Sequence, residues 1–124
     1  MPFNDLARRA ALYHEELHSV MVKVLLSGRY VLGGEGRRFE ESFARHVGAR
    51  FAIGVNSCTD ALALALRALD VGEGDEVITV ANTSVPTVAA IRMTRAIPVF
   101  ADIDSTHTIA PHDIEKRITK MTKA

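Results

Sequence analysis

The sequence has little of several features that define whole classes of protein. Its 124 residues include one cysteine, Cys58, and no tryptophan. A single cysteine excludes an internal disulfide and fits a reducing compartment, so we expect a cytoplasmic protein. No apolar run reaches the roughly 20 residues of a membrane-spanning helix. Residues 1–5 lack the basic and apolar regions of a secretory signal, so we expect neither a leader nor a membrane partner.

An excess of charge of one sign is also absent. Lysine and arginine together number 15, as do aspartate and glutamate, and the formal net charge is zero. This balance gives no support for nucleic acid or an acidic membrane surface as a partner. Hydrophobic residues make up 48% and charged residues 24% of the chain. These proportions are typical of a soluble globular protein, and the length suits one small domain.

The first third of the chain shows helical periodicity. Apolar residues recur at steps of three and four over residues 6–26 and predict one amphipathic helix that ends at Gly28. Phenylalanine and valine at the same spacing over residues 39–47 predict a second helix that ends at Gly48. Between them lies a glycine-rich segment, residues 33–36, which we expect to be a flexible connection because glycine has little conformational preference.

After residue 48 the pattern changes to alternating strands and helices. Short apolar runs predict strands, and the segments between them have helical composition or a proline where a helix begins. This alternation predicts an α/β protein with a largely parallel sheet. The predicted strands are residues 51–55, 76–80 and 97–101, and the helices that follow them are residues 58–69, 84–94 and 111–119.

The turn at residues 56–59 joins the first predicted strand to its helix. Ser57 and Thr59 are of the types that cap helices, and the unpaired amides of a helix start form an anion site to which both hydroxyls could add. Parallel sheets bind ligands at the carboxyl ends of their strands, where the loops at 81–84 and 102–104 would also lie. The turn therefore predicts a phosphate site, with an ordinary capped helix as the alternative.

A second motif suggests different chemistry. His14-Glu15-Glu16-Leu17-His18 has the H-E-x-x-H spacing, which places two histidines on one helix face where both can reach a zinc ion. With Glu15 as the base, this would be a small zinc hydrolase. A third ligand is needed, and Glu40 or Glu41 could supply it. The alternative is a polar stripe that faces solvent.

Four short motifs follow one another along nearly the whole chain, and their order is more informative than any one of them. The motifs are Leu32-Gly33-x-Glu35 with Phe39-Glu40, Ser57-x-Thr59-Asp60-Ala61-Leu62, Gly74-Asp75-Glu76-Val77-Ile78, and Pro98-Val99-Phe100 with Asp102. This order resembles the amino-terminal part of the DegT/StrS family of sugar aminotransferases, which use pyridoxal phosphate (PLP) and have fold type I.

The resemblance implies a fold and a set of cofactor-binding residues. Residues 1–124 would form one incomplete domain, part of the large domain of fold type I, with a helical segment at 1–48 and three strand-helix units at 49–124. The turn Ser57-Cys58-Thr59 would hold the cofactor phosphate. The loop that ends at Ser84 would lie over the pyridine ring, where many members carry a stacking aromatic that serine cannot replace.

The resemblance also implies a reaction. The full enzymes transfer an amino group from an amino acid, commonly glutamate, to a nucleotide-linked keto sugar, and they act as dimers. Their cofactor-bearing lysine lies downstream of the part that residues 1–124 match, so no catalytic residue is carried over. The alternative is a truncated relative that binds PLP or a partner without catalysis. In fold type I, later strands separate residues 51–55 from 76–80, so we expect residues 1–124 alone to be poorly soluble or partly disordered.

Overall fold

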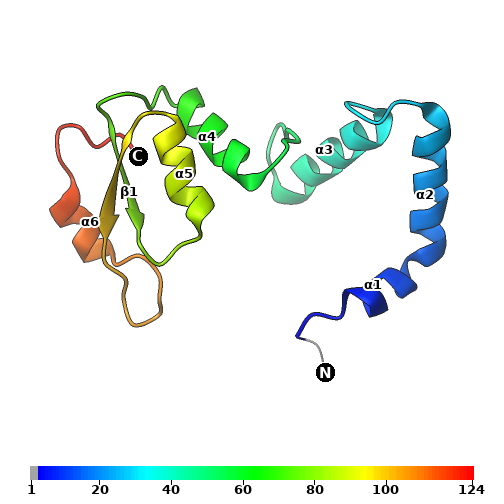
Figure 1. The fold of residues 1–124 in the computed structure, drawn as a ribbon, viewed down its shortest axis with the longest axis horizontal. Coiled ribbons are helices and arrows are strands. Elements are labelled where there is room, and N and C mark those ends of the chain that lie inside the picture. The colour runs from blue at the N-terminus through cyan, green and yellow to red at the C-terminus, as the bar shows by residue number, and fades with distance from the viewer. Residues whose placement is uncertain (1–2) are drawn as a thin grey trace. The chain divides into compact units, whose positions relative to one another are not determined.

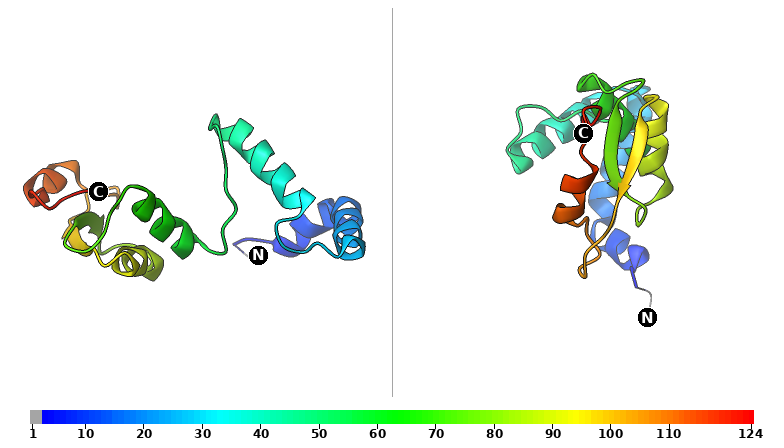
Figure 2. Two further views of the ribbon diagram at one scale, coloured as in Figure 1. Left: turned by 90° about the horizontal axis from the view of Figure 1, so that it is seen from above. Right: turned by 90° about the vertical axis from the view of Figure 1, so that its left-hand side faces the viewer.

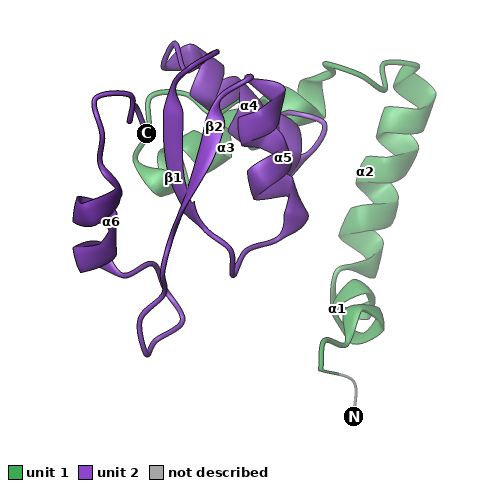
Figure 3. Ribbon diagram, turned by 60° about the vertical axis from the view of Figure 1, so that its left-hand side comes forward, with its two compact units in different colours: residues 1–54 green, residues 55–124 purple. Residues whose placement is uncertain are grey.

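The computed structural model describes residues 3–124, which divide into two compact units (Figure 3). Unit 1 ends at Gly54, and unit 2 extends from Val55 to Ala124. Unit 1 consists of helices, whereas unit 2 contains both helices and strands. We describe each unit by itself.

Unit 1 begins with two helices where one continuous helix was predicted. These are α1 (Leu6–Leu12) and α2 (His14–Ser27) (Figure 1). The prediction is wrong at Tyr13, where φ is −117° and ψ is 16°. The Tyr13 amide donates to the carbonyl of Ala10, three residues back, at 3.2 Å. Such a bond tightens the last turn of a helix, so it closes α1 and lets α2 start anew.

The third helix, α3 (Gly34–Val47), starts inside the glycine-rich segment. The prediction of a flexible connection over residues 33–36 is therefore wrong. Gly33 is extended, with φ −79° and ψ 177°, and residues 34–36 form the first turn of α3. The helix ends are as predicted: Gly28 and Gly48 adopt left-handed φ values of 64° and 72° directly after α2 and α3, a conformation that glycine adopts without strain.

The predicted strand at residues 51–55 does not form, so only two of the three predicted strands are present. Phe51 is 76% exposed and Ile53 is 81% exposed. A β-strand exists only through its hydrogen bonds to a neighbouring strand, and residues 51–55 have no strand partner among residues 3–124. Residues 51–55 therefore have the apolar composition of a strand without the hydrogen-bonded neighbour that a strand requires.

Unit 2 contains the other predicted elements, with boundaries within two residues of those expected. β1 and β2 run parallel in the register from Glu76 opposite Ile97 to Val80 opposite Ala101. Helices α5 and α6 cover opposite faces of this pair, as Figures 1 and 2 show. The prediction of an α/β fold with a parallel sheet is confirmed. The elements are α4 (Cys58–Ala68), β1 (Glu76–Val80), α5 (Val85–Met93), β2 (Ile97–Ala101) and α6 (Pro111–Arg117).

A small hydrophobic core lies where α4 and α5 meet the sheet. Its four buried residues come from the turn before β1, from β1, from α5 and from the turn before β2, with the half-buried Leu66 of α4 packed against them. None of the four buried residues is more than 6% exposed. They are Val71, Val77, Ile91 and Ala96. This core fixes the position of α4 and α5 against the sheet, and with them the loops at its carboxyl edge.

The last residues of the chain lie along the free edge of β1, opposite β2. The amides of Glu76 and Ile78 donate to the carbonyls of Met121 and Ala124, both at 2.8 Å, and Lys123 returns a bond to Glu76 at 2.9 Å. The bridge between Glu76 and Thr122 is parallel. β1 is therefore hydrogen-bonded along both edges, to β2 on one side and to residues 121–124 on the other. Across residues 3–124, we find no helix with the length and apolar character to cross a membrane.

Candidate functional site

The predicted phosphate site lies at the start of α4. Ser57 is the N-cap residue: its φ of −153° and ψ of 163° are extended, and its hydroxyl oxygen accepts from the Asp60 amide at 3.1 Å. The Ala61 amide bonds to the Ser57 carbonyl at 3.0 Å, which begins the helical ladder. The amides of Cys58 and Thr59 form no such bond to other described residues. Two N–H groups are thus left to donate to a ligand.

Besides capping α4 as predicted, the Ser57 hydroxyl is a hydrogen-bond donor within the turn. The hydroxyl donates to Asp60 Oδ2 at 2.9 Å, and Nδ2 of the Asn56 side chain also donates to this oxygen at 3.4 Å. Ser57 is half-buried and fixes the turn rather than pointing a free donor outward. The hydroxyl left for an anion is that of Thr59, which forms no hydrogen bond to another described residue. Sequence reasoning missed Asp60 as the group that engages Ser57, although the S-x-x-D spacing is a known capping pattern.

The three loops that were predicted to lie at one edge of the sheet do leave their elements toward the same edge. Because Val80 lies opposite Ala101, the loops after β1 and β2 leave the sheet at the same edge. The Arg67 guanidinium near the end of α4 donates to the carbonyl of Met93 at the end of α5, at 3.1 Å. α4 and α5 pack together in the same sense (Figure 1), so both helix starts face the carboxyl edge. No hydrogen bond joins the turn at Ser57 to the other two loops within residues 3–124.

Ser84 is the N-cap residue of α5 and lies at the carboxyl end of β1. Its φ of −77° and ψ of 151° are extended, and its side chain forms no capping bond. It lines a hollow of about 480 Å³ whose walls are mainly apolar, with the half-buried Val88 and the ring of Phe100 among them. Thr83 Oγ1 lies 2.9 Å from Thr87 Oγ1, which ties the loop to the first turn of α5. The Ser84 hydroxyl is exposed beside an apolar wall.

The end of β2 is held by a buried carboxylate. Asp113 of α6 is 8% exposed, and its Oδ2 accepts from the Asp102 amide at 2.8 Å and from Arg117 Nε at 3.3 Å. The bond from the Asp102 amide, outweighing partial desolvation, and the charge of Arg117 lower the pKa of Asp113 below its ordinary range. This contact fixes the backbone where the chain leaves the sheet, so it positions the loop at residues 102–104.

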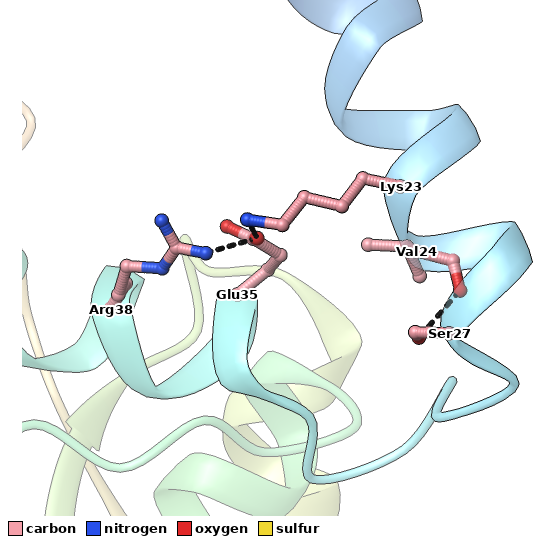
Figure 4. Close-up of polar contacts among 5 residues, drawn as sticks. All are labelled: Lys23, Val24, Ser27, Glu35 and Arg38. Atoms are coloured by element: carbon pink, nitrogen blue, oxygen red, sulfur yellow. Dashed lines mark hydrogen bonds and ion pairs between the residues drawn. The ribbon is translucent and has the colours of Figure 1, made fainter.

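Unit 1 contains a charged cluster that sequence reasoning did not find. Glu35 Oε1 accepts from Lys23 Nζ at 2.9 Å and from the guanidinium of Arg38 (Figure 4). The bond from Lys23, with the charges of Arg38 and Lys23, lowers the pKa of Glu35 against partial desolvation. The three-residue spacing of Glu35 and Arg38 on a helix could have predicted half of this cluster. Lys23 comes from α2, and only the structure places it there.

The two histidines of the H-E-x-x-H motif lie side by side on α2, with ring centroids 6.3 Å apart. In the part of the chain that the structure describes, no group of three or more histidine, cysteine, aspartate or glutamate side chains is arranged to hold a metal ion. One predicted third ligand, Glu40, instead accepts from the Gly54 amide at 2.6 Å. The geometry gives the zinc hydrolase hypothesis no support.

Fold and site together define an α/β protein with two parallel strands and a helix, α4, whose first two amides have no partner among the described residues. The profile of the DegT/DnrJ/EryC1/StrS aminotransferase family matches residues 12–124. The chain belongs to this family. The resemblance drawn from the motif order is thereby confirmed, and the zinc hydrolase alternative is set aside.

Two curated relatives show how much of the family the chain covers. It is 45% identical to a dTDP-3-amino-3,6-dideoxy-alpha-D-galactopyranose transaminase of Aneurinibacillus thermoaerophilus, over 100% of this chain and 34% of the relative. It is 39% identical to a UDP-2-acetamido-2-deoxy-3-oxo-D-glucuronate aminotransferase of Pseudomonas aeruginosa, over 98% of this chain and 34% of the relative. The chain therefore spans about a third of the length of these relatives.

Solved structures show the same fold. The structure of Streptomyces venezuelae DesV in complex with a ketimine intermediate superposes with a TM-score of 0.93 at 42% identity, over 98% of this chain and 33% of DesV. NtdA of Bacillus subtilis with bound cofactor PMP superposes with a TM-score of 0.90 at 31% identity, over 98% of this chain and 28% of NtdA. The predicted fold class, part of an aminotransferase of fold type I, is confirmed.

Proposed function

We propose that this chain supplies the phosphate-binding part of a PLP-dependent aminotransferase that acts on nucleotide-linked keto sugars. The amino donor is an amino acid. When bound, PLP supplies the electron sink for the transfer. The residues of this chain bind and orient it. The names of two relatives describe a transaminase of a dTDP-linked sugar and an aminotransferase of a UDP-linked sugar, which supports this class of substrate.

The donor set at the start of α4 fits the cofactor phosphate. The amides of Cys58 and Thr59 and the Thr59 hydroxyl are available, and the helix start adds partial positive charge. Ser57 holds this turn in shape through Asp60. Because the amide donors belong to the backbone, Cys58 can stand there without loss of the contact. The two free amides at a strand-turn-helix junction are the observation that carries the proposal.

Ser84 would lie beside the ring of the cofactor rather than beneath its phosphate. It sits at the same sheet edge, against the apolar wall of the 480 Å³ hollow. A serine at this place can donate or accept a hydrogen bond but cannot stack on a ring. We propose that the stacking contact common in the family is replaced here by this weaker polar contact.

The remaining proposals concern the whole protein. We propose that both units belong to one domain of it, that it works in the cytoplasm, where an exposed free thiol such as that of Cys58 stays reduced, and that it is a homodimer. Support for the dimer comes from the apolar side chains that unit 1 leaves exposed, such as Leu25 at 65% and Leu26 at 81%. Sedimentation equilibrium of the protein as its host makes it tests the dimer, and a monomer at micromolar concentration would contradict it.

The central experiment is cofactor trapping in the protein as its host makes it. Borohydride reduction in the presence of PLP should fix the cofactor to one lysine, which peptide mass spectrometry locates. Thr59→Val should weaken PLP binding by about tenfold to a hundredfold, because it removes a hydrogen bond to a charged group. The control is Thr119→Val, which removes a hydroxyl that bonds to Glu76 at the opposite end of β1; it should leave PLP binding unchanged.

The outcomes separate the alternatives. Reversible PLP binding with no covalent fixation would favour the truncated, non-catalytic relative. Failure to bind PLP at all, or equal PLP affinity in Thr59→Val and the wild type, would overturn the assignment of this turn to the cofactor phosphate.

A further inference from the structure

Two histidines at the start of α2 have no role in the proposed function. His14 is the first residue of α2, and His18 lies one turn further along the same face of the helix. Both side chains are exposed, and neither forms a hydrogen bond or an ion pair with another residue in the range 3–124. Both rings can therefore bind a ligand from solution without breaking a contact in this range.

The distance between the two rings suits a shared metal ion. Their centroids lie 6.3 Å apart, and the ring planes are tilted by 31°. Metal–nitrogen bonds of about 2.0–2.1 Å place the centroids of two imidazoles on one ion roughly 4.5–6.4 Å apart, depending on the angle at the metal. The observed separation is at the upper end of this range, so a closing movement of about 1 Å by the exposed side chains gives a tetrahedral angle.

Two histidines suffice for binding an ion but not for zinc hydrolase chemistry. A catalytic zinc site has three protein ligands and one open position. Within the described residues, no third histidine, cysteine, aspartate or glutamate side chain joins the pair to complete such a group. Water would fill the other coordination positions. The pair can therefore anchor an ion at the surface of α2 without activating a substrate.

The start of α2 lacks the side-chain cap that two other helices of the chain have. Tyr13 stands at the N-cap position and provides no side-chain hydrogen bond, and α2 buries no residue. By contrast, α1 and α4 are capped by Asp5 and Ser57. An ion held by His14 and His18 would link the two ends of the first turn of α2, which the missing cap leaves free to fray.

The charges around the pair suit a bound cation. A positive ion is unfavourable at a helix start because it adds to the partial positive charge of the free amides. Glu15 and Glu16 lie in the same first turn of α2, and neither forms an ion pair within residues 3–124. Their two carboxylates offset both the helix dipole and the charge of a divalent ion.

We propose that His14 and His18 bind one divalent transition-metal ion and that this ion stabilises α2. Imidazole nitrogen suits zinc, copper and nickel, whereas Mg²⁺ and Ca²⁺ prefer oxygen ligands, so the pair selects the first class of ion. The pair belongs to unit 1, whereas the residues assigned to PLP belong to unit 2. The ion takes no part in the transfer of the amino group.

The test is Zn²⁺ binding by isothermal titration calorimetry, with the protein as its host makes it, stripped of metal by a chelator, and zinc chloride alone as the titrant. A variant that exchanges two neighbouring residues, His18→Ser with Ser19→His, keeps the composition and moves one ring off the shared face. It should weaken binding by about tenfold or more, because the two ligands no longer act together. The control His46→Ala removes a histidine from the end of α3 and should change binding less than twofold.

A second measurement reads the effect of the ion on α2. At a Zn²⁺ concentration ten times the dissociation constant, hydrogen exchange through local opening of residues 18–27 should slow by up to about tenfold in the wild type. The exchanged variant at the same Zn²⁺ concentration should show no slowing. This readout separates an ion bound by the pair from one bound by a single ring, which links nothing across the turn.

Several results would overturn the proposal. The site is absent if Zn²⁺ does not bind at millimolar concentration, or if the wild type and the exchanged variant bind it equally well. Loss of binding in His46→Ala would place the ion elsewhere in the chain. Binding at the pair without slower exchange in α2 would remove the stabilising role. The PLP trapping experiment is independent of all these outcomes, because none of its variants changes α2.

Discussion

Unit 1 and unit 2 obtain their structure from different sources. α1 and α2 contain no buried residue, and α3 buries only Ala44. Unit 2 instead has a hydrophobic core, in which Ala96 has no exposed surface. Unit 1 relies on local features: the cap from Asp5 to the Arg8 amide, the two left-handed glycines and the ion pairs of Glu35.

The comparison shows what local features can and cannot achieve. Caps and exposed ion pairs are each worth about 1 kcal/mol or less, and isolated helices of about 14 residues are marginal in water. α2 and α3 have 14 residues each. The sequence therefore specifies where these helices begin and end, but burial elsewhere must stabilise them. Unit 2 contains much of its own stabilisation.

The largest expected difference is in hydrogen exchange of the isolated 124-residue chain. Amides in β1 and β2 are held in a sheet that packs on the core, so we expect slow exchange over residues 76–80 and 97–101. Residues 14–27 should exchange close to the rate of an unfolded peptide. Peptide-resolved mass spectrometry measures both. A single cooperative unfolding transition that includes both units would contradict the comparison, as would equal protection.

The next test replaces one aliphatic side chain in each unit. Ile91 is 3% exposed, and Ile91→Ala should lower the free energy of opening of β1 and β2 by about 2–5 kcal/mol. Leu26 is 81% exposed, and Leu26→Ala should change the stability of the isolated chain by about 0.5 kcal/mol or less. Hydrogen exchange in each variant gives these values. In the proposed homodimer Leu26 acquires cover, so a larger cost there than in the isolated chain would sharpen the contrast.

Much of unit 2 could be predicted from the sequence because its elements satisfy their own requirements. Residues 76–80 and 97–101 are apolar, bounded by turns, and pair with each other, so both strands match the prediction residue for residue. Residues 51–55 have the same composition and fail, because a strand depends on a neighbour that may lie anywhere in a chain. The prediction for the glycine-rich segment, residues 33–36, was wrong for a different reason. Glycine permits many conformations, so the composition does not show that residues 34–36 form the first turn of α3, where Glu35 pairs with Lys23 and Arg38.

The candidate site also has features that the sequence predicts and features that only the structure shows. Ser57 was predicted as a capping residue from its type and place, and it caps α4. The sequence does not show which way its hydroxyl proton points, so its bond to Asp60 was missed. The tie from Asp113 to the Asp102 amide joins residues eleven apart across a turn, and only the packing of α6 against β2 makes it visible.

A smaller effect is expected from Asp113, which links α6 to the sheet in unit 2. Its folded pKa lies below the ordinary value of 3.8. It therefore stabilises the fold above that value, and the contribution is lost as the pH falls through the folded pKa. Asp113→Asn should be less stable than the wild type at neutral pH, and the difference should shrink below about pH 4. Urea unfolding from pH 7 to 2 measures this.

The control for Asp113 is Glu73→Gln. Glu73 is 79% exposed and pairs with Arg95 at 3.5 Å, so its loss should have little effect at any of these pH values. A stability difference for Asp113→Asn that stays constant across the whole range would show that the side chain acts through packing and not through its charge.

The smallest expected effects have opposite signs at the two ends of α3 and test whether unit 1 depends on local conformation alone. Gly48 has a φ of 72° with no atom near an added Cβ, so Gly48→Ala adds only backbone strain and should destabilise the helix by about 1 kcal/mol. Gly36 lies in the first turn of α3 with open space around it, so Gly36→Ala should stabilise by about 0.5–1 kcal/mol. Circular dichroism of both variants measures helix content against temperature. If Gly36→Ala instead destabilises, something packs against the start of α3, and unit 1 is not held by local features alone.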